Sequence, residues 1–157
     1  MTQRAAAVAA TIDPAARAIL GSQVVLDLYE CQTPHLDDLE WVKTTLVDAA
    51  RAAGATIVQT VFHKFAPWGI SGVVVISESH LAIHIWPEKR YAAIDIFTCG
   101  DKVRMDVASE NLKQAFQSGR SVEKAFSRGD QMSARQGRTP KQRRRGQAAL
   151  VPSPLCG

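Results

Sequence analysis

The sequence lacks any apolar run close to the roughly 20 residues that a transmembrane helix needs. Its first 20 residues are interrupted by Arg4, Asp13, Pro14 and Arg17, so they do not contain the apolar stretch of a secretory signal. We therefore expect a cytoplasmic protein without a membrane anchor. The chain has 157 residues, 46% of them hydrophobic, which is the size and composition of one globular domain.

Cysteine is also scarce, and the three that occur, Cys31, Cys99 and Cys156, are widely spaced. This pattern matches neither a disulfide framework nor a pair of CxxC motifs. His80 and His84 share one face of a predicted strand, but no carboxylate or thiol lies at a spacing typical of zinc ligands. We therefore expect no bound metal, and we expect any functional cysteine to act alone.

Acidic residues are few at the C-terminal end. Residues 120–157 contain 9 Lys/Arg and 2 Asp/Glu, whereas residues 1–119 contain 10 and 13. Most of the positive charge lies between Arg135 and Arg145, in a segment without an aromatic side chain that could stack on a base. Nucleic-acid binding through these charges is one alternative, but we expect a solvated, disordered tail over residues 127–157. Residues 1–21 are expected to be a loosely ordered leader.

Apolar residues repeat at every second position in several short segments, which is typical of half-buried strands. We predict strands over residues 24–29, 56–65, 72–76, 80–86 and 91–98. Spacings of three and four residues predict one helix with Thr33 as N-cap, Pro34 at its first position and its end at Gly54, and a second helix over residues 108–117. This order predicts an α+β fold over residues 22–126, a two-layer α/β sandwich with a largely antiparallel sheet and helices on one face.

Residues 63–100 contain most of the side chains that could carry chemistry. They are His63, Ser71, Ser77, Glu78, Ser79, His80, His84, Glu88 and Cys99. The alternation over residues 80–86 places His80, His84 and Trp86 on one face of a strand. Such groups on short, rigid strands are candidates for an active site, although spacing alone does not distinguish them from ordinary surface or core residues.

Four stretches of the chain resemble a known family. They are Leu28-Tyr29-Glu30-Cys31, Gly54-Ala55-Thr56-Ile57-Val58, the run from Phe62 to Glu88 with Ser77-Glu78-Ser79-His80, His84 and Trp86-Pro87-Glu88, and the run from Tyr91 to Gly100 with Phe97-Thr98-Cys99-Gly100. Over about residues 22–118 the chain closely resembles prokaryotic S-adenosylmethionine decarboxylase proenzymes. The resemblance implies a self-processing enzyme that decarboxylates S-adenosyl-L-methionine for spermidine biosynthesis. It also implies a homodimer of processed units, with S-adenosylmethionine as substrate.

The family's chemistry depends on a carbonyl group that the chain makes from itself. Decarboxylation of an α-amino acid leaves a carbanion, so the substrate amine first condenses with a carbonyl that withdraws electrons. In this family the serine after the scissile bond, here Ser79, attacks the carbonyl of Glu78 and converts the peptide into an ester. Elimination and hydrolysis then yield a β chain, residues 1–78, and an α chain, residues 79–157, that begins with a covalently bound pyruvoyl group.

The resemblance also assigns roles to three further residues. By position, His84 matches the histidine that takes the α-proton during processing, a step suited to imidazole because it exchanges protons near neutral pH. Ser71 matches a serine that assists processing by hydrogen bonding. Cys99 matches the residue that protonates the product carbon.

Four residues correspond to positions that contact the substrate in the family. Phe65 and Tyr29 match aromatic side chains that sandwich the adenine, and a nearby cationic sulfonium also favours aromatic faces. Glu88 matches a carboxylate that accepts hydrogen bonds from the ribose hydroxyls. Glu30 matches an acid near the substrate or the processing site.

The sequence departs from the family pattern in three places. Ile85 stands where threonine is usual, Lys89-Arg90 replaces a Tyr-Gly turn, and the basic C-terminal extension is long. Because Lys89-Arg90 follows Glu88 directly, it could change the substrate preference. A pyruvoyl-dependent arginine or ornithine decarboxylase on the same scaffold therefore stays an alternative, but Phe65 favours an adenine-containing substrate.

Overall fold

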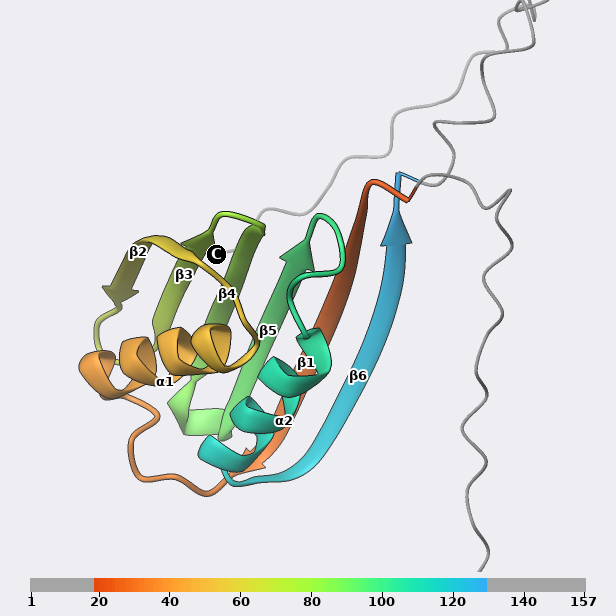
Figure 1. The fold of residues 1–157 in the computed structure, drawn as a ribbon. Coiled ribbons are helices and arrows are strands. Elements are labelled where there is room, and N and C mark those ends of the chain that lie inside the picture. Colours follow the sequence, from red (N-terminus) through yellow and green to blue (C-terminus); the bar gives the residue numbers. More distant parts are fainter. Residues whose placement is uncertain (1–18, 130–157) are drawn as a thin grey trace, which may run out of the picture.

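The computed structural model describes residues 19–129, which form an antiparallel sheet of six strands with two helices on one of its faces (Figure 1). In sheet order the strands are β2 (Ile57–Lys64), β3 (Ile70–Ile76), β4 (Ser79–Trp86), β5 (Tyr91–Thr98), β1 (Gly21–Cys31) and β6 (Ser118–Arg128). The helices are α1 (Leu39–Ala52) and α2 (Met105–Ala115), and a short 3-10 turn spans Pro87–Lys89. The predicted two-layer α+β sandwich is confirmed.

The hydrophobic core lies between the helices and the sheet. On β4, Leu81, Ile83 and Ile85 are buried on the helix side, whereas His84 and Trp86 are exposed on the other side, as the alternation predicts. Each fully buried aliphatic side chain stabilises the fold by about 1.5–3 kcal/mol. A slip of one residue would move the buried set into solvent, so the core fixes the register of the strands.

Helix α1 begins later than the sequence predicts. Its N-cap is Asp38, whose side chain accepts a hydrogen bond from the backbone N–H of Trp41 at 3.1 Å. Thr33, the predicted N-cap, is buried in the preceding loop, where its hydroxyl oxygen accepts the backbone N–H of His35 at 3.4 Å. The prediction was wrong because a hydroxyl residue followed by proline is also compatible with a local turn.

Strand β6 was not predicted. It is an edge strand whose side chains are nearly all exposed, so no buried alternation marks it in the sequence. Its backbone pairs with β1 from Gly21↔Arg128 to Cys31↔Ser118, and this main-chain ladder holds it in place. It extends two residues into the segment predicted as a tail. The charged run from Arg135 to Arg145 and the predicted leader up to residue 18 lie outside the described residues.

The second face of the sheet has no helix over it within residues 19–129 (Figure 1). A row of rings crosses this open face at one end of the sheet, with centroid separations of 5.1 Å for Tyr29–Tyr91, 5.4 Å for Tyr91–Trp86 and 6.3 Å for Trp86–His84. A sheet face of this kind is solvated or covered by another molecule. No helix in this range is long and apolar enough to cross a membrane.

Candidate active site

The Glu78–Ser79 peptide lies in the tight turn between β3 and β4. Ile76 and Ser79 pair across the two strands, so only Ser77 and Glu78 make the connection. Ser79 has a φ of 148°, in a region that costs a residue other than glycine about 1–3 kcal/mol. The backbone carbonyl of Glu78 accepts a hydrogen bond from the backbone N–H of Cys99 at 2.9 Å. The peptide is therefore strained on its serine side, and its carbonyl is polarised.

The Glu78 side chain is held by two segments that are distant in sequence. One carboxylate oxygen accepts a hydrogen bond from Lys102 Nζ at 2.5 Å, and the other accepts the backbone N–H of Thr56 at 3.1 Å. Lys102 Nζ also donates to the Thr56 hydroxyl at 3.0 Å. The Lys102 ammonium, and next the Thr56 N–H, hold the pKa of the Glu78 carboxyl below its usual value. Sequence analysis missed both residues, because they are 24 and 22 positions from Glu78.

Two further groups stand beside Ser79. His80 Nδ1 lies 3.3 Å from Ser79 Oγ, and the His80 ring stacks on Phe97 with centroids 6.0 Å apart and an interplanar angle of 13°. Cys99 is an exposed free thiol directly after Thr98, the residue that pairs with Ser79. We call Glu78, Ser79, His80, Cys99 and Lys102 the scissile cluster, after the peptide bond at which the family resemblance implies cleavage.

A second group of predicted residues lies at the other end of β3 and β4. Ser71 and His84 face each other across the strands, with Ser71 Oγ 2.8 Å from His84 Nδ1. They line a cavity of about 350 Å³ together with Phe65, Trp68, Trp86 and Glu88. We call this cavity the His84 pocket. It brings together four of the residues that the sequence singled out: Phe65, Ser71, His84 and Glu88.

The two groups are far apart in a single chain. Ser79 begins β4, and His84 follows five residues later on the same extended strand. At about 3.3 Å per residue, their Cα atoms are separated by roughly 16 Å. Because Ser79 and His84 are close in sequence, they suggested one site, but the extended strand between them keeps their side chains well apart. One chain therefore holds the scissile cluster and the His84 pocket at opposite ends of the sheet.

Tyr29 and Glu30 lie at the same end of the sheet as His84 but do not line its pocket. The Tyr29 ring ends the aromatic row, with the Arg120 guanidinium 3.8 Å above its centroid. Glu30 has a φ of 56°, and its carboxylate lies close to Gly119, where a Cβ would come within 2.8 Å of it. The Tyr91 hydroxyl donates to Asp27 at 2.5 Å, and burial together with this carboxylate raises the pKa of Tyr91.

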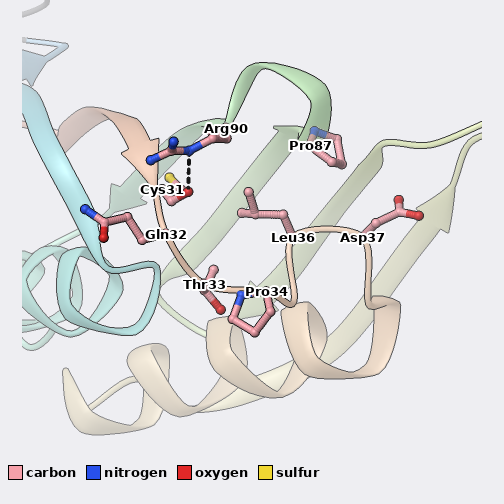
Figure 2. A pocket seen from close by; sticks show the side chains of 8 residues that line it. All are labelled: Cys31, Gln32, Thr33, Pro34, Leu36, Asp37, Pro87 and Arg90. Carbon is pink, nitrogen blue, oxygen red and sulfur yellow. Dashed lines mark hydrogen bonds between the residues drawn. The ribbon is translucent and has the colours of Figure 1, made fainter.

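A further hollow of about 530 Å³ lies between the loop that precedes α1 and the turn after β4. Figure 2 shows Arg90 reaching across it from the turn, with Nε donating to the Cys31 carbonyl at 3.1 Å. Arg90 has a φ of 51°, a left-handed conformation that costs a residue other than glycine about 1–2 kcal/mol. Its contacts with the Cys31 and Glu30 carbonyls offset this cost. Nothing predicted as a site residue lines this hollow.

Comparison with known proteins identifies the family over nearly all of the described residues. A family model described as S-adenosylmethionine decarboxylase matches residues 22–129. The chain belongs to the S-adenosylmethionine decarboxylase family. This confirms the resemblance drawn from the Ser77-Glu78-Ser79-His80 and Phe97-Thr98-Cys99-Gly100 motifs.

Individual relatives agree with the family assignment. The chain is 49% identical over 111 residues to an S-adenosylmethionine decarboxylase proenzyme of Pseudomonas paraeruginosa, which covers 71% of the chain and 69% of the relative. It is 47% identical over 110 residues to the proenzyme of Acidithiobacillus ferrooxidans, covering 70% and 83%. The crystal structure of an adenosylmethionine decarboxylase from Aquifex aeolicus superimposes with a TM-score of 0.64 at 30% identity, covering 71% of this chain and 92% of that one.

Among residues 19–129, no group of three or more His, Cys, Asp or Glu side chains is arranged to hold a metal ion.

Proposed function

We propose that this decarboxylase acts on S-adenosyl-L-methionine with a pyruvoyl group that it makes from its own Ser79. The chain cleaves itself between Glu78 and Ser79 into a β chain, residues 1–78, and an α chain, residues 79–157. The observation that carries this proposal is the Glu78 carbonyl, held by the Cys99 N–H directly before a strained serine. The product, decarboxylated S-adenosylmethionine, is the aminopropyl donor for spermidine biosynthesis.

The geometry of the turn supports the first chemical step. Ser79 Oγ attacks the carbonyl carbon of Glu78, the bond from that carbon to the Ser79 nitrogen breaks, and an ester with a free amine results. Negative charge develops on the Glu78 oxygen, where the Cys99 N–H stabilises it. Cleavage of the peptide also releases the backbone strain at Ser79. Elimination then frees the Glu78 carboxylate, and hydrolysis releases ammonia.

The pyruvoyl carbonyl supplies the electron sink for decarboxylation, so the reaction requires no metal ion. Cys99 follows the residue that pairs with Ser79, and its thiol protonates the product carbon. The exposed Cys99 and the buried Cys31 are both free thiols, a state that suits the reducing cytoplasm. We place the enzyme in that compartment.

The His84 pocket binds the substrate. Phe65 offers an aromatic face to the adenine, and Glu88 accepts hydrogen bonds from the ribose hydroxyls. Tyr29, which the resemblance assigns to the adenine together with Phe65, lies outside this pocket with the Arg120 guanidinium over its ring, and Glu30 beside it supplies negative charge. An arginine or ornithine decarboxylase would have no need of an aromatic adenine site. Nucleic acid has no part in this activity.

The active unit is a homodimer in which each site is shared. Ser79 and His84 must meet during processing, yet they stand at opposite ends of β4. Packing two open sheet faces about a two-fold axis perpendicular to β4 reverses that strand in the second copy. The scissile cluster of one copy then faces the His84 pocket of the other.

The substrate assignment is tested by measuring release of carboxyl-labelled CO₂. The wild-type protein should release CO₂ from S-adenosyl-L-methionine and not from arginine or ornithine. Ser79→Ala removes the attacking hydroxyl, so this variant should stay uncleaved and release nothing above the rate without enzyme. Ser77→Ala is the matched control and should retain both cleavage and release. Comparable release from arginine or ornithine would contradict the proposed substrate.

The shared site is tested by co-expressing Ser79→Ala and His84→Ala chains that carry different tags. Neither variant should process alone, because one lacks the nucleophile and the other lacks the base for elimination. In mixed dimers, the His84→Ala chain should be cleaved, since it supplies Ser79 and its partner supplies His84. If neither chain is cleaved in mixed dimers isolated by both tags, processing occurs within one chain.

Cys99→Ala separates making the pyruvoyl group from using it. The variant keeps the backbone N–H that holds the Glu78 carbonyl, so it should still process. Turnover should fall by about 10² or more, the usual contribution of a positioned general acid. Without the thiol, protonation at the wrong carbon leaves the amine on the enzyme and inactivates it progressively with substrate. Sustained turnover near the wild-type rate would show that the thiol is not the proton donor.

A further inference from the structure

We propose that His80 is the acid–base residue of the acyl shift, the first step of self-processing. The inference rests on the proposed function and adds a residue to it. The acyl shift needs a base that removes the proton from Ser79 Oγ and an acid that protonates the departing Ser79 nitrogen. Within one chain, His84 lies five residues along β4 from both atoms, and in the proposed dimer the His84 of the other copy takes the α-proton in the later elimination.

All four histidines of the sequence lie in the described residues, which allows a direct comparison. His84 Nδ1 contacts Ser71 Oγ at the far end of β4. His35 stacks on Trp41 before α1, and His63 packs against Phe65 near the end of β2. His80 is the histidine whose ring nitrogen lies within hydrogen-bond distance of Ser79 Oγ, at 3.3 Å. That separation is long for a hydrogen bond, as is common for catalytic contacts before substrate or strain tightens them.

The orientation of the His80 ring is fixed by its surroundings. It stacks on Phe97, the residue paired with it on β5, and its backbone is held in the sheet between β3 and β5. The stacked ring keeps Nδ1 directed at the hydroxyl. With the proton of the neutral ring on Nε2, Nδ1 is free to accept the hydroxyl proton.

The step balances without any external reagent. His80 Nδ1 takes the proton from Ser79 Oγ as that oxygen bonds to the Glu78 carbonyl carbon, and the Cys99 N–H stabilises the charge on the carbonyl oxygen. When the tetrahedral carbon collapses, its bond to the Ser79 nitrogen breaks. The imidazolium returns the same proton to that nitrogen, which gives the ester, a free amine and a neutral His80. The amine and the ester oxygen belong to one residue, so a single base serves both.

Two histidines then divide the processing reaction. His80 of the chain being cleaved carries out the acyl shift, and His84 removes the α-proton in the elimination that follows. This division predicts that the two histidine variants stop at different chemical stages. A full-length chain without His80 contains an intact peptide, whereas a full-length chain without His84 contains an ester that hydroxylamine cleaves.

The test follows cleavage of freshly translated full-length chains over time, with and without hydroxylamine. His80→Ala and His80→Asn should slow the appearance of the two fragments by about 10² or more, and their uncleaved chains should resist hydroxylamine. The Asn side chain keeps a hydrogen-bonding group near Ser79 but is not basic, so it separates proton transfer from positioning. His84→Ala should instead accumulate a hydroxylamine-sensitive chain. His35→Asn is the control histidine variant and should process at the wild-type rate.

The unfolding temperatures of the His80 variants should match that of an uncleaved Ser79→Ala chain, which shows that slow cleavage does not reflect loss of the fold. Processing of His80→Asn near the wild-type rate would overturn the inference, and so would a hydroxylamine-sensitive ester in His80→Ala. Either outcome leaves the proposed function intact, provided that the wild-type chain still yields two fragments. If the wild-type chain yields none, the proposed function fails first.

Discussion

The restraint on the Glu78–Ser79 peptide is the interaction from which the proposed chemistry follows. The Cys99 N–H holds the carbonyl, while Lys102 and Thr56 hold the Glu78 side chain. These contacts come from the residue before β2, the β3–β4 turn and the segment after β5, and they meet only in the folded sheet. The proposed self-cleavage is therefore coupled to folding, because an unfolded chain has neither the polarised carbonyl nor the constrained serine.

The one-sided sheet explains how a small chain can make a complete site. The helices cover one face, and the core between them fixes the register of β3, β4 and β5. The same register places the scissile cluster and the His84 pocket at opposite ends of β3 and β4. In the proposed dimer, pairing two copies in reverse orientation brings the scissile cluster of one copy to the His84 pocket of the other.

The alternation of β4 was predictable from the sequence because burial of Leu81, Ile83 and Ile85 leaves a clear two-residue period. The start of α1 was not, because Asp38 competes with Thr33 as a cap and only the tertiary structure decides between them. Strand β6 leaves no pattern of buried residues in the sequence, because its side chains are exposed and main-chain pairing with β1 holds it in the sheet. Side-chain periodicity thus predicts the half-buried strand β4 better than it predicts the exposed edge of the sheet.

The candidate site was likewise predictable in part from the sequence. Motif spacing made Ser79, His84 and Cys99 candidate site residues, but it could not give the distance between Ser79 and His84, which depends on whether the intervening residues are extended. Lys102 lies in no motif, and no contact of Thr56 follows from the stretch that contains it, because the contacts of both residues with Glu78 arise from the packing of separate loops. The role proposed for His80 could not be predicted either, because it depends on the direction in which a ring stacked on Phe97 points.

Self-processing at Ser79 is tested most directly by intact mass spectrometry of the purified wild-type protein under denaturing conditions. Two species are expected. One is the encoded peptide 1–78 with a free carboxylate at Glu78, and the other spans residues 79–157 with a mass lower than that of the encoded peptide by one ammonia. The loss of ammonia identifies a pyruvoyl group and distinguishes self-processing from proteolysis, which would leave the mass of the second fragment unchanged. A single full-length species, or a second fragment with an intact serine at its start, would contradict the account.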